Sequence, residues 1–183
     1  MGLHVLFWTP MIVRIVRRKT PEITIGDELA TMFRIPGLVM YLVGILIVWT
    51  ALTVRAWTTG LDPHISGRVI VGILLHAMGI GLMFWAFSVH ASWNIQPRLE
   101  PDHQLCTGGP YRLVRHPIYL AFNLLSVGTV IWVPDLLVMV GAALIIIGGD
   151  LRARSEEIVL AQRFGEQYQT YMSRVSRTIP GLY

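Results

Sequence analysis

Residues 117–149 read PIYLAFNLLSVGTVIWVPDLLVMVGAALIIIGG, and this stretch decides the fold. It contains two apolar runs, Pro117–Val133 of 17 residues and Leu136–Gly149 of 14, separated only by Pro134 and Asp135. So short a break between two long apolar runs predicts a tight helical hairpin. Each run is near or below the ~20 residues that cross a bilayer, so we expect the pair to be thin or extended by its flanks.

Two longer apolar runs precede the hairpin. Gly37–Val54 is closed by Arg55, and Val69–Val89 is entered from Arg68. Each has the length of a membrane-spanning helix. In the second run, three small residues favour close contact between helices; they are Gly72, Gly79 and Gly81. His76 lies in the same run, where it either serves a site or hydrogen-bonds a neighbouring helix, and we favour the second role.

The composition is that of a membrane protein. Hydrophobic residues make up 54% of the 183 residues and charged residues only 14%, with a mean hydropathy of +0.57. We therefore predict an all-α, polytopic integral membrane protein with about four to five transmembrane helices. Basic residues lie at the ends of the apolar runs, so the membrane and not nucleic acid is the expected partner. The single cysteine, Cys106, and the spacing of the histidines indicate no metal site.

The predicted organisation is a single domain over residues 1–183. Residues 1–35 form an N-terminal interfacial or short first helix, and we expect Asp27–Phe33 to lie along the membrane surface. The remaining segments are two spans in 36–89, a loop in 90–116, the hairpin in 117–149 and a C-terminal arm in 150–183.

The distribution of arginine and lysine predicts the orientation. Thirteen of the 15 lie in the N-terminal region, the 90–116 loop or the C-terminal arm, and the other two are Arg55 and Arg68. With four spans, the first three groups share one side of the membrane. Because the basic side faces the cytoplasm, both termini and the central loop are expected there.

The C-terminal arm is too polar to cross a membrane. Its aromatic and apolar residues recur at three- and four-residue steps, which is typical of one face of a helix; they are Ala161, Phe164, Tyr168, Tyr171 and Val175. We expect this face to pack against the membrane bundle or the central loop.

The polar passage His103–Tyr119 contains the first cluster of candidate functional groups. Gly108, Gly109 and Pro110 predict a tight turn at which the backbone can approach a bound molecule. Donors, acceptors and aromatic rings follow it, namely Tyr111, Arg112, Arg115, His116 and Tyr119. The alternative is a surface loop whose arginines serve only the membrane orientation.

A second cluster begins where the last apolar run ends. Arg152 and Glu156 are four residues apart and share one face of a helix. Glu157 continues the face of Phe164 and Tyr168, so periodicity turns Glu157 inward instead of Glu156. Adjacent helical residues point in different directions, and we therefore expect only one of the two acids to face the site.

These motifs resemble those of the isoprenylcysteine carboxyl methyltransferase family and related integral membrane methyltransferases, including phospholipid N-methyltransferases. The matching segments are HQLCTGGPY at 103–111, RHPIY at 115–119, Arg152 with Glu156 and Glu157, and FGEQYxxYxxRV at 164–175. The likeness covers roughly residues 90–180. Ala121 stands where the family usually has glycine.

The resemblance implies a cytosol-facing pocket for S-adenosyl-L-methionine and a lipidic substrate that enters from the bilayer. Carried over position by position, it assigns Arg152 to the substrate. It assigns the cofactor to Gln96, His103, Gln104, Leu105, Cys106, Tyr111, His116, Pro117, Ile118, Tyr119 and Glu156. In this pocket an acid would meet the cofactor's ammonium, and Arg115 or backbone N–H groups of the glycine turn would meet its carboxylate.

Several functions remain open on these grounds. Carboxyl O-methylation of an isoprenylcysteine-like acid needs only an arginine to orient an ionised acceptor, as Arg152 could do. Phospholipid (ethanolamine) N-methylation needs a base, for which His116 and Glu157 are candidates. The final residues 179–183 also resemble NADPH-dependent sterol reductases. A non-catalytic membrane scaffold would use only the basic charge of the loop.

Overall fold

A computed structural model describes residues 25–58, 67–89 and 105–182. The part of the predicted N-terminal helix before residue 25 and the predicted site residues Gln96, His103 and Gln104 lie outside these ranges. The elements are α2 (Ile25–Thr58), α3 (Gly67–Val89), the 3-10 helix η1 (Gly109–Arg112), α4 (Pro117–Trp132), α5 (Leu136–Phe164) and α6 (Glu166–Arg174).

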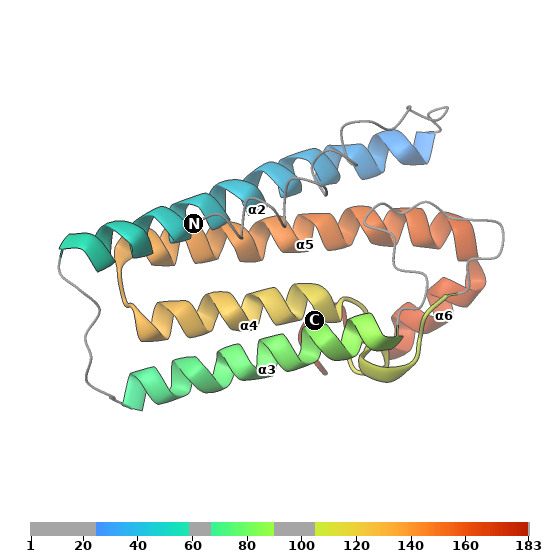
Figure 1. Ribbon diagram of the computed structural model, residues 1–183. Coiled ribbons are helices and arrows are strands. Elements are labelled where there is room, and N and C mark those ends of the chain that lie inside the picture. Colours follow the sequence, from blue (N-terminus) through green and yellow to red (C-terminus); the bar gives the residue numbers. More distant parts are fainter. Residues whose placement is uncertain (1–24, 59–66, 90–104, 183) are drawn as a thin grey trace.

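The four long helices lie side by side in the order α2, α5, α4, α3, each antiparallel to its neighbour (Figure 1). The short elements η1 and α6 lie together at one end of this row, where α3 and α5 end and α4 begins. Within the described ranges, α2, α3 and α5 are long and apolar enough to cross a membrane, and α4 is a shorter apolar helix. The prediction of an all-helical polytopic membrane protein is confirmed.

Small residues spaced seven apart bring the helices together in pairs. On α2 and α5, Gly44 faces Gly141 and Gly37 faces Gly148, so closely that a Cβ at Gly44 would lie 2.6 Å from the Gly141 carbonyl oxygen. On α3, the predicted contact residue Gly79 packs against the backbone of Ala121 on α4, where a Cβ would lie 2.8 Å from the carbonyl oxygen. In a membrane such contacts stabilise helix pairs by van der Waals packing.

Gly72 makes the same kind of contact with Gly128 of α4, at 3.0 Å from a built Cβ to the carbonyl oxygen. Gly81 does not, because a Cβ there would meet no atom of the described residues within 4 Å, so the prediction was wrong for this glycine. His76 lies at the α3–α4 interface, with Nδ1 2.7 Å from the Gly72 carbonyl oxygen and Nε2 3.2 Å from Thr129 Oγ1. Both ring nitrogens have hydrogen-bond partners, and one of these lies on the neighbouring helix, as expected for the structural role that we favoured.

The hairpin between α4 and α5 is confirmed. Asp135 caps α5 by accepting hydrogen bonds from the backbone N–H groups of Leu137 at 2.8 Å and Val138 at 3.4 Å. Its other carboxylate oxygen lies 3.8 Å from Arg55 at the end of α2. These contacts hold three helix ends together opposite the end that bears α6.

The helices run through two of the predicted segment boundaries. Asp27–Phe33 belongs to α2, which continues through Pro36 to Thr58. The last apolar run and the start of the arm form one helix, since residues 150–164 contain neither proline nor glycine to end it. The break comes at Gly165, whose φ of 49° favours glycine, and α6 sets off from there in a new direction.

Candidate functional site

The glycine turn before α4 packs against the end of α3. The backbone N–H of Tyr111 donates to the Gly108 carbonyl at 3.1 Å, which closes the turn, and Gly109 has a φ of 54°. A Cβ at Gly109 would lie 2.7 Å from Val89 and 3.2 Å from Trp85. The close contact with α3 therefore requires glycine at this position. The sequence interpretation had explained the glycine by a bound molecule instead.

Tyr111 is held in the interior by α6. Its side chain is buried, and its carbonyl accepts a 2.6 Å hydrogen bond from the hydroxyl of Tyr171. Burial raises the pKa of the Tyr111 phenol above its usual value, and the nearby Cys106 thiol and Glu156 carboxylate raise it further. The turn thus brings Tyr111 and Cys106 within electrostatic range of one another, and Tyr111 within range of Glu156.

The segment 114–116 pairs with the end of the chain. Val114 and Ser176 form a parallel bridge, the N–H of Arg115 donates to the Ser176 carbonyl at 2.8 Å, and that of His116 donates to Arg177 at 3.0 Å. Pro117 then begins α4, where its missing N–H costs no hydrogen bond. The predicted packing of the arm against the central loop is confirmed for the described residues.

Glu157 accepts from two arginines that are distant in sequence. Arg115 contacts Oε1 through Nε at 2.8 Å and a terminal nitrogen at 2.6 Å. Arg177 contacts Oε2 through Nε at 3.0 Å and a terminal nitrogen at 2.7 Å. The carboxylate is only 9% exposed, and both of its oxygens are engaged. Paired forks of this kind make Glu157 the centre of a buried structural cluster.

Arg115 also clamps the C-terminal segment. One of its terminal nitrogens donates to the carbonyl of Met172 at 3.2 Å and to that of Val175. The sequence interpretation suggested that Arg115 contacts a cofactor carboxylate. In the structure its guanidinium already makes four contacts with protein atoms. We assign it to holding α6 against the start of α4.

Glu156 lies in a different set of contacts. The hydroxyl of Tyr119 donates to Glu156 Oε1 at 2.6 Å and accepts from Arg152 Nε at 3.1 Å. A terminal nitrogen of Arg152 lies 4.0 Å from the same oxygen. The Glu156 side chain is 32% exposed, so it remains accessible where Glu157 is enclosed. An acid and a guanidinium are thus held side by side by one tyrosine hydroxyl.

His116 lies between the two acids. Its Nδ1 is 3.5 Å from Glu156 Oε2 and its Nε2 is 3.4 Å from Glu157 Oε1, although the second contact lacks hydrogen-bonding orientation. Burial alone lowers the pKa of this imidazole, but the two carboxylates outweigh burial and raise it above its usual value. Glu157 is turned inward, as periodicity predicted, and Glu156 is the more exposed of the two acids. His116 nevertheless contacts both carboxylates, because its two ring nitrogens lie on opposite sides of the ring.

The remaining predicted residues are close to these segments in the chain. Leu105 and Cys106 are half-buried just before the turn, Pro117 is buried, and Ile118 is half-buried in the first turn of α4. Sequence reasoning missed Arg177 and the Tyr171 contact with Tyr111. The signal available for Arg177 was charge, since two adjacent acids next to a buried histidine require more than one cation.

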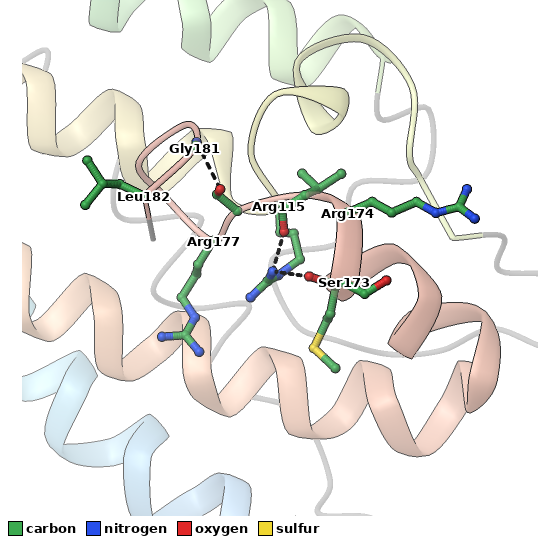
Figure 2. Close-up of a pocket in the computed structure, with 9 residues that line it drawn as sticks. Arg115, Ser173, Arg174, Arg177, Gly181 and Leu182 are labelled. Carbon is green, nitrogen blue, oxygen red and sulfur yellow. Dashed lines mark hydrogen bonds between the residues drawn. The ribbon is translucent and has the colours of Figure 1, made fainter.

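A cavity of about 260 Å³ has Arg115 and Arg177 in its wall (Figure 2). Its walls come from Arg115, the end of α6 and residues 175–177, 181 and 182. In Figure 2 the Arg115 guanidinium reaches carbonyls of this segment, whereas Arg174 points away. The cavity is thus formed by Arg115 and the C-terminal segment that Arg115 contacts. Tyr119, Arg152 and Glu156 are not among its lining residues.

Comparison with known proteins gives several relatives with named activities. The probable protein-S-isoprenylcysteine O-methyltransferase of Oryza sativa subsp. indica is 36% identical over 87 residues, which cover 47% of this chain and 46% of that protein. The human protein-S-isoprenylcysteine O-methyltransferase is 30% identical over 145 residues, covering 76% of this chain and 51% of that one. The chain spans about half the length of these curated relatives.

A third relative has another acceptor in its name. The methanethiol S-methyltransferase of Pseudomonas deceptionensis is 23% identical over 191 residues, covering 96% of this chain and 64% of that protein. No solved structure matches the chain. The family model described as phospholipid methyltransferase matches residues 67–167, more than half of the chain and the part that carries Tyr111, His116, Arg152 and Glu156. The chain belongs to the phospholipid methyltransferase family.

Proposed function

We propose that this protein transfers a methyl group from S-adenosyl-L-methionine to the carboxylate of an isoprenylcysteine-like lipid acid. One observation carries the proposal: Tyr119 holds the partly exposed carboxylate of Glu156 beside the guanidinium of Arg152. A site for this reaction needs a negative group for the cofactor and a positive group for the acceptor, close together. The names of the rice and human relatives support the same acceptor.

The residues present suit the cofactor. Its ammonium requires an acid, and Glu156 is the accessible one of the pair. Its cationic and aromatic parts favour contact with aromatic rings. Tyr111 and Tyr119 supply two such rings, one before and one after His116 in the sequence. When bound, S-adenosylmethionine supplies an electrophilic methyl group that a carboxylate oxygen can accept while the sulfur leaves as a neutral thioether. We include Leu105, Cys106, His116, Pro117 and Ile118 in this pocket, with Gln96, His103 and Gln104 from the preceding loop.

The state of His116 and Glu157 favours a carboxylate over an amine as the acceptor. A protonated lipid amine must lose a proton to a base before it can be methylated. His116 is enclosed by two carboxylates, which raise the pKa of its imidazole above the usual value and engage both of its nitrogens, and Glu157 is occupied by two arginines. An ionised acid needs neither of them. Arg152 can orient it, and alignment alone contributes on the order of 7–11 kcal/mol in well-oriented reactions.

We also propose that the site faces the cytoplasm and that the acceptor enters from the bilayer. The helix arrangement supports this orientation, since α2 and α4 begin and α3 and α5 end at the same end of the row, and most arginines of the described segments lie towards that end. The opposite end has Arg55 and Arg68. A membrane site of this kind lets an apolar tail stay in lipid while the reactive head meets a water-soluble cofactor.

A methyl-transfer assay tests the proposal. Purified protein in phospholipid nanodiscs is incubated with radiolabelled S-adenosylmethionine and, separately, a farnesylcysteine acid, phosphatidylethanolamine or methanethiol. We expect label in a base-labile methyl ester with the first acceptor alone. A base-stable product from phosphatidylethanolamine would support the N-methyltransferase instead, and volatile label from methanethiol an S-methyltransferase. Absence of binding in isothermal titration with S-adenosylmethionine would exclude all three.

A further inference from the structure

Tyr41 lies on α2, outside the part of the chain that the family model matches. The helix is close to α5 here, since a Cβ at Gly148 would lie 2.7 Å from the backbone nitrogen of Tyr41. The ring of Tyr41 packs edge-on against Phe122 of α4, with centroids 5.5 Å apart and an interplanar angle of 86°. Three helices therefore fix the position of this ring.

The hydroxyl of Tyr41 is buried without a hydrogen-bond partner among the described residues. Leaving a buried hydroxyl unpaired is unfavourable, and phenylalanine would fill the same space without that cost. The neighbouring rings and glycines would pack equally well around a phenyl group. The polar atom therefore calls for a partner that comes from outside the described chain.

Arg152 lies next to this part of α2, since a Cβ at Gly37, one helical turn before Tyr41, would lie 3.0 Å from the backbone nitrogen of Arg152. Its Nε is used by Tyr119, but a terminal nitrogen is 4.0 Å from Glu156, beyond hydrogen-bond distance. A guanidinium has five N–H donors, so Arg152 can still donate to a ligand. Gly149 faces both tyrosines: a Cβ there would lie 3.5 Å from the ring of Tyr119 and 3.9 Å from that of Tyr41, at ordinary contact distance. Both rings therefore lie against the same point of α5.

We infer that the Tyr41 hydroxyl is a second hydrogen-bond donor, together with Arg152, for the anionic head of the lipid acid. The inference rests on the function proposed above and adds to it a specificity-determining residue. A hydroxyl and a guanidinium suit a carboxylate, and they disfavour the ammonium of a phospholipid amine. The hydroxyl lies away from water, where a hydrogen bond to a charged group is stronger than at an exposed site.

The surface next to Tyr41 suits the apolar tail of such a substrate. Leu38 and Ile45 lie one helical turn before and after Tyr41, and each is 39% exposed on a helix that is long and apolar enough to cross the membrane. A chain lying along this side of α2 would have its head at the level of Tyr41 and Arg152. The acceptor would thus reach the site laterally from lipid.

The test compares Tyr41→Phe with Tyr168→Phe. Tyr168 also has a buried hydroxyl without a partner among the described residues, but it lies on α6. We expect Tyr41→Phe to raise the KM for farnesylcysteine acid roughly 10- to 100-fold, the effect of losing a hydrogen bond to a charged group, with unchanged affinity for S-adenosylmethionine. Tyr168→Phe should leave both values at those of the unaltered protein.

A neutral inhibitor separates recognition of charge from packing. Farnesylcysteine carboxamide has the same tail but no anionic head. Tyr41→Phe should weaken inhibition by a non-reactive sulfonate analogue more than inhibition by the carboxamide, because a hydrogen bond to a charged acceptor is the stronger one. Equal losses for both ligands, or an unchanged KM in a protein that methylates farnesylcysteine acid, would overturn the role of Tyr41 alone. If the unaltered protein transfers no methyl group to the acid, the proposed function fails instead.

Discussion

Tyr119 on α4 donates a 2.6 Å hydrogen bond to Glu156 on α5, and this contact joins the two halves of the site. The donor belongs to the segment that follows the glycine turn, and the acceptor lies 37 residues further along the chain. Because the same hydroxyl accepts a hydrogen bond from Arg152, it holds the Glu156 carboxylate and the Arg152 guanidinium next to each other. Glu157, one residue on, is instead held by Arg115 and Arg177.

The two neighbouring acids are therefore expected to fail in different ways. Glu156→Gln should weaken S-adenosylmethionine binding about 10- to 100-fold, because it removes the accessible charge, and should change stability little. Glu157→Gln should destabilise the fold by about 3–5 kcal/mol, because it leaves two buried arginines without their shared carboxylate. Isothermal titration and thermal unfolding in detergent measure the two effects. The reverse assignment of effects would show that Glu157 is the cofactor ligand.

Arg152 is expected to act on the acceptor. Arg152→Ala should raise the KM for the lipid acid at least 10-fold and change the affinity for S-adenosylmethionine by less, because the guanidinium contacts Glu156 only at 4.0 Å. Arg154→Ala is the control, since Arg154 is on the same helix but is 44% exposed and paired with Asp150. Steady-state kinetics with each substrate varied in turn makes the measurement. A loss of cofactor affinity equal to the rise in KM would contradict the assignment.

His116 makes stability depend on pH. Its folded-state pKa is raised above the ~6.5 of an unfolded chain, so the imidazolium stabilises the fold fully below about pH 6.5. That contribution disappears as the pH rises through the folded-state pKa. The difference in Tm between the unaltered protein and His116→Gln should therefore shrink from pH 6 to pH 9. A difference that stays constant over this range would mean that the imidazole is neutral in the fold.

The glycines of α3 provide a matched test of helix packing. Gly79→Ala should lower the Tm, with a cost of about 1–3 kcal/mol, because the new methyl group would lie 2.8 Å from the Ala121 carbonyl oxygen. Gly81→Ala, two residues on, meets no atom of the described residues within 4 Å and should be neutral or stabilising. Thermal unfolding of both variants in the same detergent gives the comparison. Equal effects would argue against the α3–α4 contact.

The membrane class and the hairpin were predictable because they depend on local sequence. Runs of apolar residues need no partner to indicate a span, and Asp135 caps α5 through its own neighbours. The periodic face of the arm was also correct, since Tyr168 is fully buried. The arm was predicted as one continuous helix, and this was wrong, because the backbone angles of Gly165 change the direction of the chain.

The polar motifs also identified most of the cluster, but not the partners within it. Arg115 was linked to a bound ligand, yet it holds Glu157 and the carbonyls of Met172 and Val175. No pattern in the sequence indicated a role for Arg177, although it donates to the other oxygen of Glu157. Long-range ion pairs leave no periodic signal, since each partner alone looks like an ordinary charged residue near a membrane.

By itself the sequence determined where the chain meets the bilayer, where it turns and which polar residues lie at the ends of the spans, because hydrophobic transfer and turn formation are local. Only the tertiary structure decided how the acids divide their work: Glu156 with Tyr119 and Arg152, Glu157 with Arg115 and Arg177, and His116 between them. The physical reason is distance. These groups come from a loop, two helices and a tail, and their charges interact only after packing brings them within a few ångströms.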